Sequence, residues 1–178
     1  MKRILAKSLS RRRLFAGGAA SAIAAITGAA KARVAAGTSS DFVYEITKTD
    51  EEWRAQLGDD DFAILREGFT EKPKSSPYWL EVKPGMYHCK GCDLPSFDGQ
   101  WKVLLDKGWV FFFHAVPDAV LFGIDGKVPE YGAMAPGTAI AEVHCRRCGS
   151  HLGHHLKVSG EVVHCINGAS VNFVPQSA

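Results

Sequence analysis

The sequence predicts a mainly β fold of the α+β class, built from antiparallel β-sheets, with short helices confined to its N-terminal part. After Cys92, short runs of β-branched and aromatic residues alternate with Gly, Pro and Asp turns, a pattern typical of strands. No long helical pattern separates these runs, so successive strands are expected to pair antiparallel. Two CxxC pairs far apart in the chain predict a point where distant strands are held together.

Residues 1–32 are predicted to be a twin-arginine signal peptide. A basic beginning ends in Ser10-Arg11-Arg12-Arg13-Leu14-Phe15, a Gly- and Ala-rich apolar run follows, and Ala30-Lys31-Ala32 is an A-x-A cleavage site. One alternative is a membrane anchor, although the run of about 17 residues lies at the lower limit for a span. A mitochondrial transit peptide is another. Our prediction is export to the periplasm by the twin-arginine pathway, with no stable membrane span.

Residues 33–43 are predicted to be a small polar linker, and residues 44–178 a single domain, because a chain of 178 residues suits one domain plus a tail. Thr49 or Asp50 is predicted to cap the first of one or two short helices, which break near Gly58. Residues 68–77 are expected to be extended. The turn Pro84-Gly85 is expected to lead into the first CxxC pair.

The predicted strands follow in order, each bounded by turn residues. They are 101–104, 109–113, 120–124, 139–144, 161–165 and 170–174. The segment between the second CxxC pair and residue 161 is not predicted to be a strand, and His151 and His154 are expected to lie in a tight loop around Gly153.

The charge distribution argues against a nucleic-acid partner. The whole chain carries 21 basic and 19 acidic side chains, but seven of the basic residues precede Ala32. Without them, 14 basic residues face 19 acidic ones, a net charge of −5. A domain with that charge is a poor ligand for a phosphate backbone.

The two CxxC pairs predict a metal site. Each pair places two thiolates on one side of a turn, and together the pairs supply the four ligands of a closed, structural zinc site: Cys89, Cys92, Cys145 and Cys148. The 52 residues between the pairs are too many for a compact zinc finger, so the ion is expected to clamp distant parts of a sheet. The alternative, a thioredoxin-type redox pair, lacks the βαβ pattern that would support it.

Cys165 remains as a single cysteine outside both pairs. An isolated cysteine is usually a small buried residue. Histidines are close to it in sequence, however, and an imidazolium beside a thiol lowers the thiol pKa and produces a nucleophilic thiolate. His151 and His154 are the candidate partners.

These residues resemble a known family. The segment Cys145-x-x-Cys148-Gly-Ser-His151-Leu-Gly-His154, followed by Cys165-Ile-Asn167-Gly-Ala-Ser, is similar to the B-type methionine sulfoxide reductases, as are Thr70-Glu71-Lys72-Pro73 and Pro84-Gly85-Met86-Tyr87 upstream. The resemblance covers about residues 45–174. It implies that the four paired cysteines are the structural zinc ligands and that Cys165 is the catalytic nucleophile. It further implies that His151, His154 and Asn167 organise the active site, and that Trp109 and Phe173 bind the substrate.

The reaction that the resemblance implies is reduction of methionine (R)-sulfoxide to methionine, leaving Cys165 as a sulfenic acid. The substrate would be oxidised methionine in envelope proteins or free methionine sulfoxide. Since the other four cysteines are assigned to zinc, an external thiol, such as a thioredoxin-like protein, would have to reduce the sulfenic acid.

The chain departs from the family pattern in three places. Val163-His164 replaces an arginine and an aromatic residue before the nucleophile, the loop between Leu156 and Cys165 is short, and Trp109 is followed by Val-Phe rather than Pro-Ser. Two other hypotheses therefore stay open. One is a catalytically inactive, zinc-stabilised β-domain that acts as a binding or scaffold module; the other is an enzyme acting on a different small adduct, such as a glutathione–aldehyde conjugate.

Overall fold

Two α-helices open the domain in the computed structural model, which describes residues 42–125 and 140–177. Helix α1 spans Asp50–Leu57 and α2 spans Asp59–Glu67. Thr49 caps α1 in a capping box: its hydroxyl accepts a hydrogen bond from the Glu52 amide, and the Glu52 carboxylate accepts one from the Thr49 amide. Gly58, at a φ of 77°, separates the two helices, as predicted.

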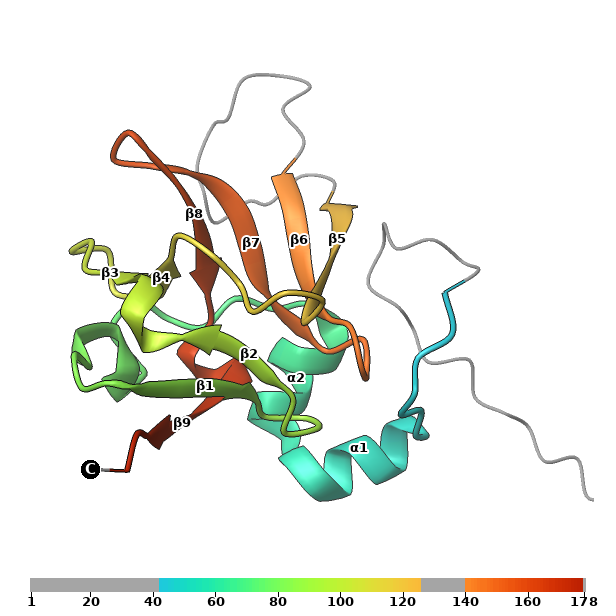
Figure 1. Ribbon diagram of the computed structural model, residues 1–178. Helices are drawn as coiled ribbons and strands as arrows, with labels where there is room; N and C mark the ends of the chain where they lie inside the picture. Colours follow the sequence, from blue (N-terminus) through green and yellow to red (C-terminus); the bar gives the residue numbers. More distant parts are fainter. Residues whose placement is uncertain (1–41, 126–139, 178) are drawn as a thin grey trace, which may run out of the picture.

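Antiparallel strands form the rest of the described chain, in two sheets (Figure 1). The smaller sheet has the order β2-β1-β9, from strands Pro95–Asp98, Gly85–Cys89 and Val171–Pro175. The larger has the order β3-β4-β8-β7-β6-β5, from strands Lys102–Val103, Val110–Phe112, Glu161–Ile166, His151–Val158, Ile140–Cys145 and Val120–Asp125. The described residues also contain three 3₁₀ turns: η1 Pro77–Leu80 between α2 and β1, η2 Gly99–Trp101 between β2 and β3, and η4 Gly168–Ser170 between β8 and β9. The predicted fold class is therefore confirmed.

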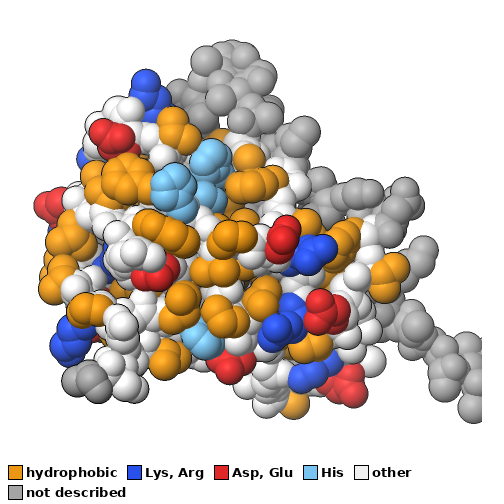
Figure 2. Space-filling view, viewed as in Figure 1, with side chains coloured by type: hydrophobic (Ala, Val, Ile, Leu, Met, Phe, Trp, Pro, Cys, Tyr) orange, Lys and Arg blue, Asp and Glu red, His pale blue; other side chains and the backbone are white. Residues whose placement is uncertain are grey.

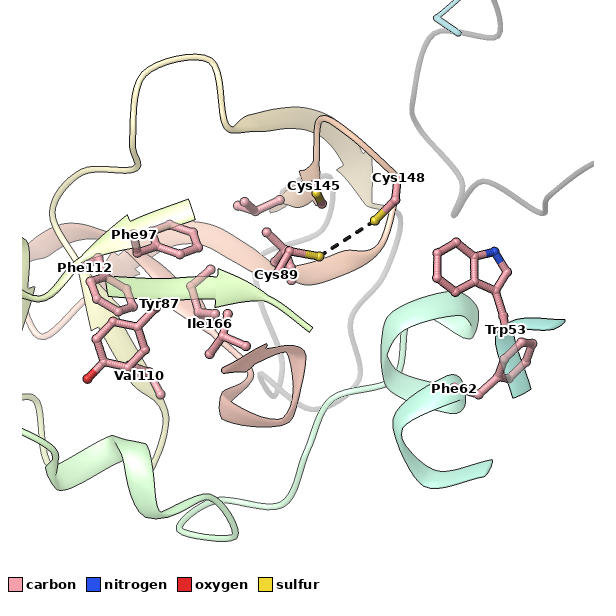
Figure 3. Packing of buried hydrophobic residues seen from close by; sticks show 13 residues of the cluster. Trp53, Phe62, Tyr87, Cys89, Phe97, Val110, Phe112, Cys145, Cys148 and Ile166 are labelled. Carbon is pink, nitrogen blue, oxygen red and sulfur yellow. Dashed lines mark hydrogen bonds between the residues drawn. The ribbon is translucent and has the colours of Figure 1, made fainter. Parts of the chain in front are cut away.

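The main core lies between the two sheets and extends to the helices. In Figure 3, Tyr87 and Phe97 from the smaller sheet gather with Phe112 from the larger one, while Trp53 and Phe62 approach from α1 and α2. The Phe97 and Phe112 rings stack with centroids 4.7 Å apart, and the Tyr87 and Phe112 rings meet edge to face at 5.0 Å. Stacked and edge-to-face pairs of this kind are favourable beyond the area they bury. This packing holds the sheets in one position relative to each other.

Three strands differ from the sequence prediction. Strand β7 occupies the segment expected to be a loop, and β1 and β2 flank the first CxxC pair, where we had predicted only turns. Strand β7 differs from the prediction because its first five residues contain three histidines and a glycine around Leu152, and so lack the apolar alternation of an ordinary strand. These polar side chains are nonetheless mostly buried, with His151 and His154 at most 2% exposed.

Several predictions fall outside the described residues. They are the signal peptide at 1–32, most of the linker at 33–43, and the first residue of the strand predicted at 139–144. Within residues 42–125 and 140–177, no helix has both the length and the apolar character needed to cross a membrane.

Candidate active site and metal centre

The four paired cysteines come together as the sequence predicts. Cys89 ends β1 and Cys145 ends β6, while Cys92 and Cys148 lie in the turns that follow these strands. The Sγ atoms of Cys89 and Cys148 are 3.8 Å apart (Figure 3), and those of Cys92 and Cys145 are 3.4 Å apart. All four ligand atoms lie within 4.8 Å of one another. Tetrahedral zinc with bonds of about 2.3 Å requires sulfurs about 3.8 Å apart, so this cluster fits one such ion.

The surroundings of the cluster suit an anionic metal–thiolate centre. The Arg66 guanidinium donates a hydrogen bond to the Cys148 carbonyl at 3.0 Å and lies 4.7 Å from the Trp53 ring centroid. Ser150 Oγ is 3.2 Å from Cys148 Sγ. A buried cation and a hydroxyl beside the sulfurs favour thiolates over thiols. Arg66 is only 8% exposed, and burial lowers its pKa, a cost that negative charge on the cluster offsets.

Cys165 occupies one row of side chains that crosses the larger sheet. In the antiparallel register, Gly123, Glu142, His154, Cys165, Phe111 and Val103 follow one another across β5, β6, β7, β8, β4 and β3. Residues directly opposite each other in an antiparallel pair project their side chains to the same face. His154 is thus the cross-strand neighbour of Cys165, with Glu142 on its other side.

A β-bulge brings His151 to the same face. The register runs from Val143↔Gly153 to His144↔His151, which leaves Leu152 as an extra residue in β7. Residues three apart on a regular strand point to opposite faces, but the extra residue restores His151 to the side of His154. Their ring centroids are 5.1 Å apart. The sequence had predicted this convergence through a loop around Gly153; the structure achieves it through a bulged strand.

Glu142 and the histidines form a buried polar cluster beside Cys165. The Glu142 carboxylate lies 2.9 Å from His144 Nε2 and 3.6 Å from His151 Nδ1. Glu142 is 4% exposed, His144 is fully buried and His151 is 1% exposed. Burial lowers the pKa of His151 well below its ordinary value, and positive charge on His154 or His144 would lower it further. His151 is therefore neutral near pH 7.

The turn after Cys165 is fixed by Glu71, which arrives from the extended segment before η1. Its carboxylate accepts hydrogen bonds from the Gly168 amide at 2.7 Å and the Ala169 amide at 3.0 Å. Its own amide donates to Asn167 Oδ1 at 3.1 Å, and its carbonyl accepts from Trp109 Nε1 at 3.2 Å. Burial raises the pKa of Glu71, while the bonds from Gly168 and Ala169 act to lower it. Glu71 thus joins two predicted site residues, Trp109 and Asn167, to the segment that follows the nucleophile.

An apolar cluster borders the thiol. Phe111, Val163 and Cys165 are buried together, and Trp109 and Leu105 pack against them. Leu105 also lines an open surface hollow of about 330 Å³ with Trp79, Leu80, Leu104 and Asp106. This apolar cluster therefore links the surface hollow to Cys165, which is itself only 3% exposed.

Two residues singled out in the sequence lie elsewhere. Phe173, expected to bind substrate, lies opposite Tyr87 in the smaller sheet, with ring centroids 4.8 Å apart, and packs against the main core rather than the Cys165 cluster. His164 projects to the opposite face from Cys165, as its place on the strand predicts, and contacts Phe97, Phe122 and His155. Burial lowers the His164 pKa to about 4. It therefore cannot supply the positive charge of the arginine missing at Val163.

Figure 2 shows histidine side chains beside hydrophobic ones on one face of the molecule. Ring contacts of this kind join His155 to His164 at 4.8 Å and Phe122 to His155 at 5.5 Å. They belong to the face of the larger sheet that is turned away from Cys165.

Sequence reasoning missed two residues of the site, Glu71 and Glu142. Glu71 stands in a segment quoted for the family resemblance, but its partners lie 96 to 98 positions away. Glu142 lies in a strand that the sequence predicts. The available signal was a carboxylate inside that largely apolar strand, where the structure shows it to be buried. A charged residue at a position facing inward is rarely buried without a partner or a role.

Together, the fold and the site define a mainly β protein with a four-cysteine cluster that could hold a metal ion, and a buried thiol paired with a histidine. The SelR domain family matches residues 57–175. Peptide methionine sulfoxide reductase MsrB of Agrobacterium fabrum is 35% identical over 134 residues, covering 74% of this chain and 94% of that protein. Its namesake from Methylibium petroleiphilum is 36% identical over 135 residues, covering 74% and 93%. This chain belongs to the SelR domain family.

A plant relative agrees with this membership, and one solved structure neither supports nor opposes it. Peptide methionine sulfoxide reductase B3 of Arabidopsis thaliana is 35% identical over 138 residues, covering 75% of this chain and 73% of that protein. Among solved structures, the crystal structure of the Mis18 "Yippee-like" domain aligns with a TM-score of 0.42 at 13% identity, covering 54% of this chain and all of that one. That likeness is too low to add to the assignment.

Proposed function

We propose that this chain, a methionine sulfoxide reductase by family, reduces the R sulfoxide of methionine with Cys165 as its nucleophile. The observation that carries the proposal is the direct cross-strand pairing of His154 with Cys165. An imidazole beside a buried thiol can take its proton, hold it, and return it to a leaving oxygen. Family membership does not favour the inactive scaffold that the sequence left open.

The proposed reaction transfers one oxygen atom. The Cys165 thiolate attacks the sulfoxide sulfur, and the imidazolium of His154 protonates the sulfoxide oxygen. The methionine sulfur is reduced by two electrons and leaves as the thioether. The Cys165 sulfur is oxidised by two electrons and becomes a sulfenic acid. We assign the proton transfer to His154 because it pairs directly with Cys165, whereas burial lowers the pKa of His151 and keeps it neutral.

The other residues bind and orient the substrate in this proposal. The Nδ2 atom of Asn167 is buried and has no hydrogen-bond partner among the described residues, so it is available to donate to the sulfoxide oxygen. The Trp109 indole, fixed by its bond to the Glu71 carbonyl, offers a surface on which the methyl and sulfur of the substrate can pack. We do not include Phe173, which packs in the main core.

We further propose that the Cys₄ cluster holds structural zinc and that an external thiol resolves the sulfenic acid. When bound, zinc supplies a cross-link between β1 and β6 and takes no part in the chemistry. With four cysteines engaged there, the resolving thiol must come from a thioredoxin-like protein or a small molecule. Mass spectrometry after a single turnover is expected to show a Cys165 sulfenic acid; a disulfide between Cys165 and a cluster cysteine would contradict this proposal.

The decisive experiment compares turnover of the R and S isomers of a methionine sulfoxide peptide with dithiothreitol as reductant. We expect methionine from the R isomer only, none from Cys165→Ser, and a rate lowered roughly 10²–10⁴-fold in His154→Gln. His155→Gln is the matched control, because the neighbouring histidine projects to the opposite face. Activity retained in Cys165→Ser, or turnover of the S isomer alone, would overturn the assignment.

We also propose export by the twin-arginine pathway, so that the substrates are oxidised methionines in envelope proteins. The basic Arg11-Arg12-Arg13 segment and the A-x-A site support this. Sequencing the N-terminus of the protein recovered from a periplasmic fraction tests it. The mature chain is expected to begin at residue 33, and recovery of an uncleaved chain from the cytosol would contradict export.

A further inference from the structure

We propose that Glu142, His144 and His151 form a second metal site, which takes a divalent ion of the zinc class and, when filled, blocks the reductase. The ligands come from neighbouring strands, Glu142 and His144 from β6 and His151 from β7. One ligand atom from each lies within 4.8 Å of the other two. The second half of the proposal rests on the function proposed above, whereas metal binding does not.

The geometry is close to what one ion requires. Zinc bonds to imidazole nitrogen and carboxylate oxygen measure about 2.0–2.2 Å, so tetrahedral ligand atoms lie about 3.3–3.6 Å apart. Glu142 Oε2 lies 2.9 Å from His144 Nε2, and Glu142 Oε1 lies 3.6 Å from His151 Nδ1. Two imidazoles and one carboxylate form a donor set that suits zinc and its first-row neighbours. Three protein ligands leave one position open.

Unsatisfied nitrogens at the same place point independently to a ligand. His144 Nδ1 and both ring nitrogens of His151 are buried without a hydrogen-bond partner among the described residues. Buried polar atoms without partners are uncommon and call for an explanation. The three side chains are at most 4% exposed, so bulk water does not solvate them. A metal ion bound at His151 Nδ1 would give that atom the partner it lacks.

The proposed site is separate from the Cys₄ cluster. His144 and Cys145 are consecutive at the end of β6, and consecutive strand residues project to opposite faces of a sheet. The two sites therefore share no ligand and differ in donor chemistry, sulfur on one face and nitrogen with oxygen on the other. This difference makes them distinguishable by spectroscopy.

Occupancy would stop catalysis by taking up space in the active site. The His154 ring centroid lies 5.1 Å from that of His151, and His154 is the cross-strand partner of Cys165. An ion held by His151 would therefore lie beside the two residues that the sulfoxide group must reach. The metal would exclude the substrate and leave the nucleophile and the fold in place.

Metal counting tests the site directly. Protein that already holds one tightly bound zinc is dialysed against Zn²⁺ or Co²⁺, and the bound ions are counted. A second equivalent is expected in the wild type and in the control His155→Gln. It should be lost in Glu142→Gln and His144→Gln, since removal of a ligand costs more than the roughly 10–100-fold that outer partners cost. Cobalt in the second site should show visible d–d bands with no added sulfur-to-cobalt charge transfer.

Three results would overturn the site: no second equivalent in the wild type, uptake that survives both substitutions, or a sulfur charge-transfer band from the second ion. The wild-type count stands even if a variant fails to fold. Inhibition is measured as methionine formed in one turnover of pre-reduced protein without added thiol. Excess Zn²⁺ should abolish it in the wild type and His155→Gln but not in His144→Gln. If the protein forms no methionine even when this second site is free of metal, the proposed function fails while the metal count remains valid.

Discussion

The backbone amide of Glu71 donates a hydrogen bond to Oδ1 of Asn167, 96 positions further along the chain, over 3.1 Å. The same residue binds the two amides after Asn167 through its carboxylate and the Trp109 indole through its carbonyl. One residue from an irregular segment therefore ties together the bend just before β4, which carries Trp109, and the turn that follows Cys165. The alignment of these two elements depends on Glu71.

Glu71→Gln is expected to loosen this alignment. Each Glu71 carboxylate oxygen accepts one of the two bonds from Gly168 and Ala169. In glutamine one of these oxygens becomes an NH₂ group, which cannot accept and which faces a backbone N–H donor. Hydrogen bonds to a charged group contribute about 1.5–3 kcal/mol, so the free energy of unfolding should fall by about that amount. KM for the sulfoxide should rise as well. Urea denaturation and steady-state kinetics measure the two effects. Glu67→Gln, which alters only a surface pair with Arg54, should change neither.

Trp109→Ala is expected to weaken binding of the sulfoxide without removing the nucleophile. Loss of the indole removes the surface proposed for the substrate methyl group, and methyl-sized contacts are each worth about 0.8 kcal/mol. KM should therefore rise several-fold or more, while iodoacetamide should still alkylate Cys165. Trp101→Ala is the matched control, because Trp101 contacts His114 and is not part of the Cys165 cluster. Equal effects of the two substitutions on KM would argue against a specific role for Trp109.

Removal of metal from the Cys₄ cluster should unfold or strongly destabilise the domain. The cluster joins β1 of the smaller sheet to β6 of the larger one, and Trp53 and Phe62 pack in the same core. Cys92→Ser should release the ion and lower the melting temperature, because metal binding is part of the folding free energy. Cys165→Ser should retain one zinc and the wild-type melting temperature. A metal-free wild-type protein with unchanged stability would contradict the structural role.

Acid should destabilise the fold in part through His164. Burial lowers its pKa to about 4 from an ordinary value near 6.5. Between these values the unfolded chain binds a proton that the folded chain does not, so stability falls as the pH drops from about 6.5 to about 4 and changes little outside that window. The loss from this residue is at most about 3 kcal/mol.

His164→Gln tests this dependence. The variant should show a flatter profile of unfolding free energy between pH 6.5 and pH 4, whatever its stability at pH 7. A profile parallel to that of the wild type would show that His164 is not the titrating group.

The sequence carried enough local pattern to predict most strands, the helical N-terminal part and the gathering of the four paired cysteines. Thr49, Gly58 and the paired cysteines act through near neighbours, and their consequences can be derived from spacing alone. Glu71 and Glu142 could not be placed in this way. Their roles depend on which strand lies beside which, and that order follows from packing over nearly one hundred residues.

Strand β7 shows the same limit at the local level. The histidines that made it look like a loop are buried because the larger sheet gives them each other and Glu142 as neighbours. Phe173 illustrates the reverse case. The family resemblance implied substrate contact for this residue, whereas the pairing of β9 with β1 places it against Tyr87.

The extra residue in β7, Leu152, determines from which face of the sheet His151 projects. On an ordinary strand, an odd spacing such as that from His151 to His154 separates two side chains onto opposite surfaces. One inserted residue reverses this for everything on one side of it. If the same residues paired with β6 without the bulge, the chain could keep its hairpin, its cysteine cluster and its thiol, and yet His151 would face away from Cys165. The chemistry of this site thus depends on the register between β6 and β7 as much as on the identity of the residues.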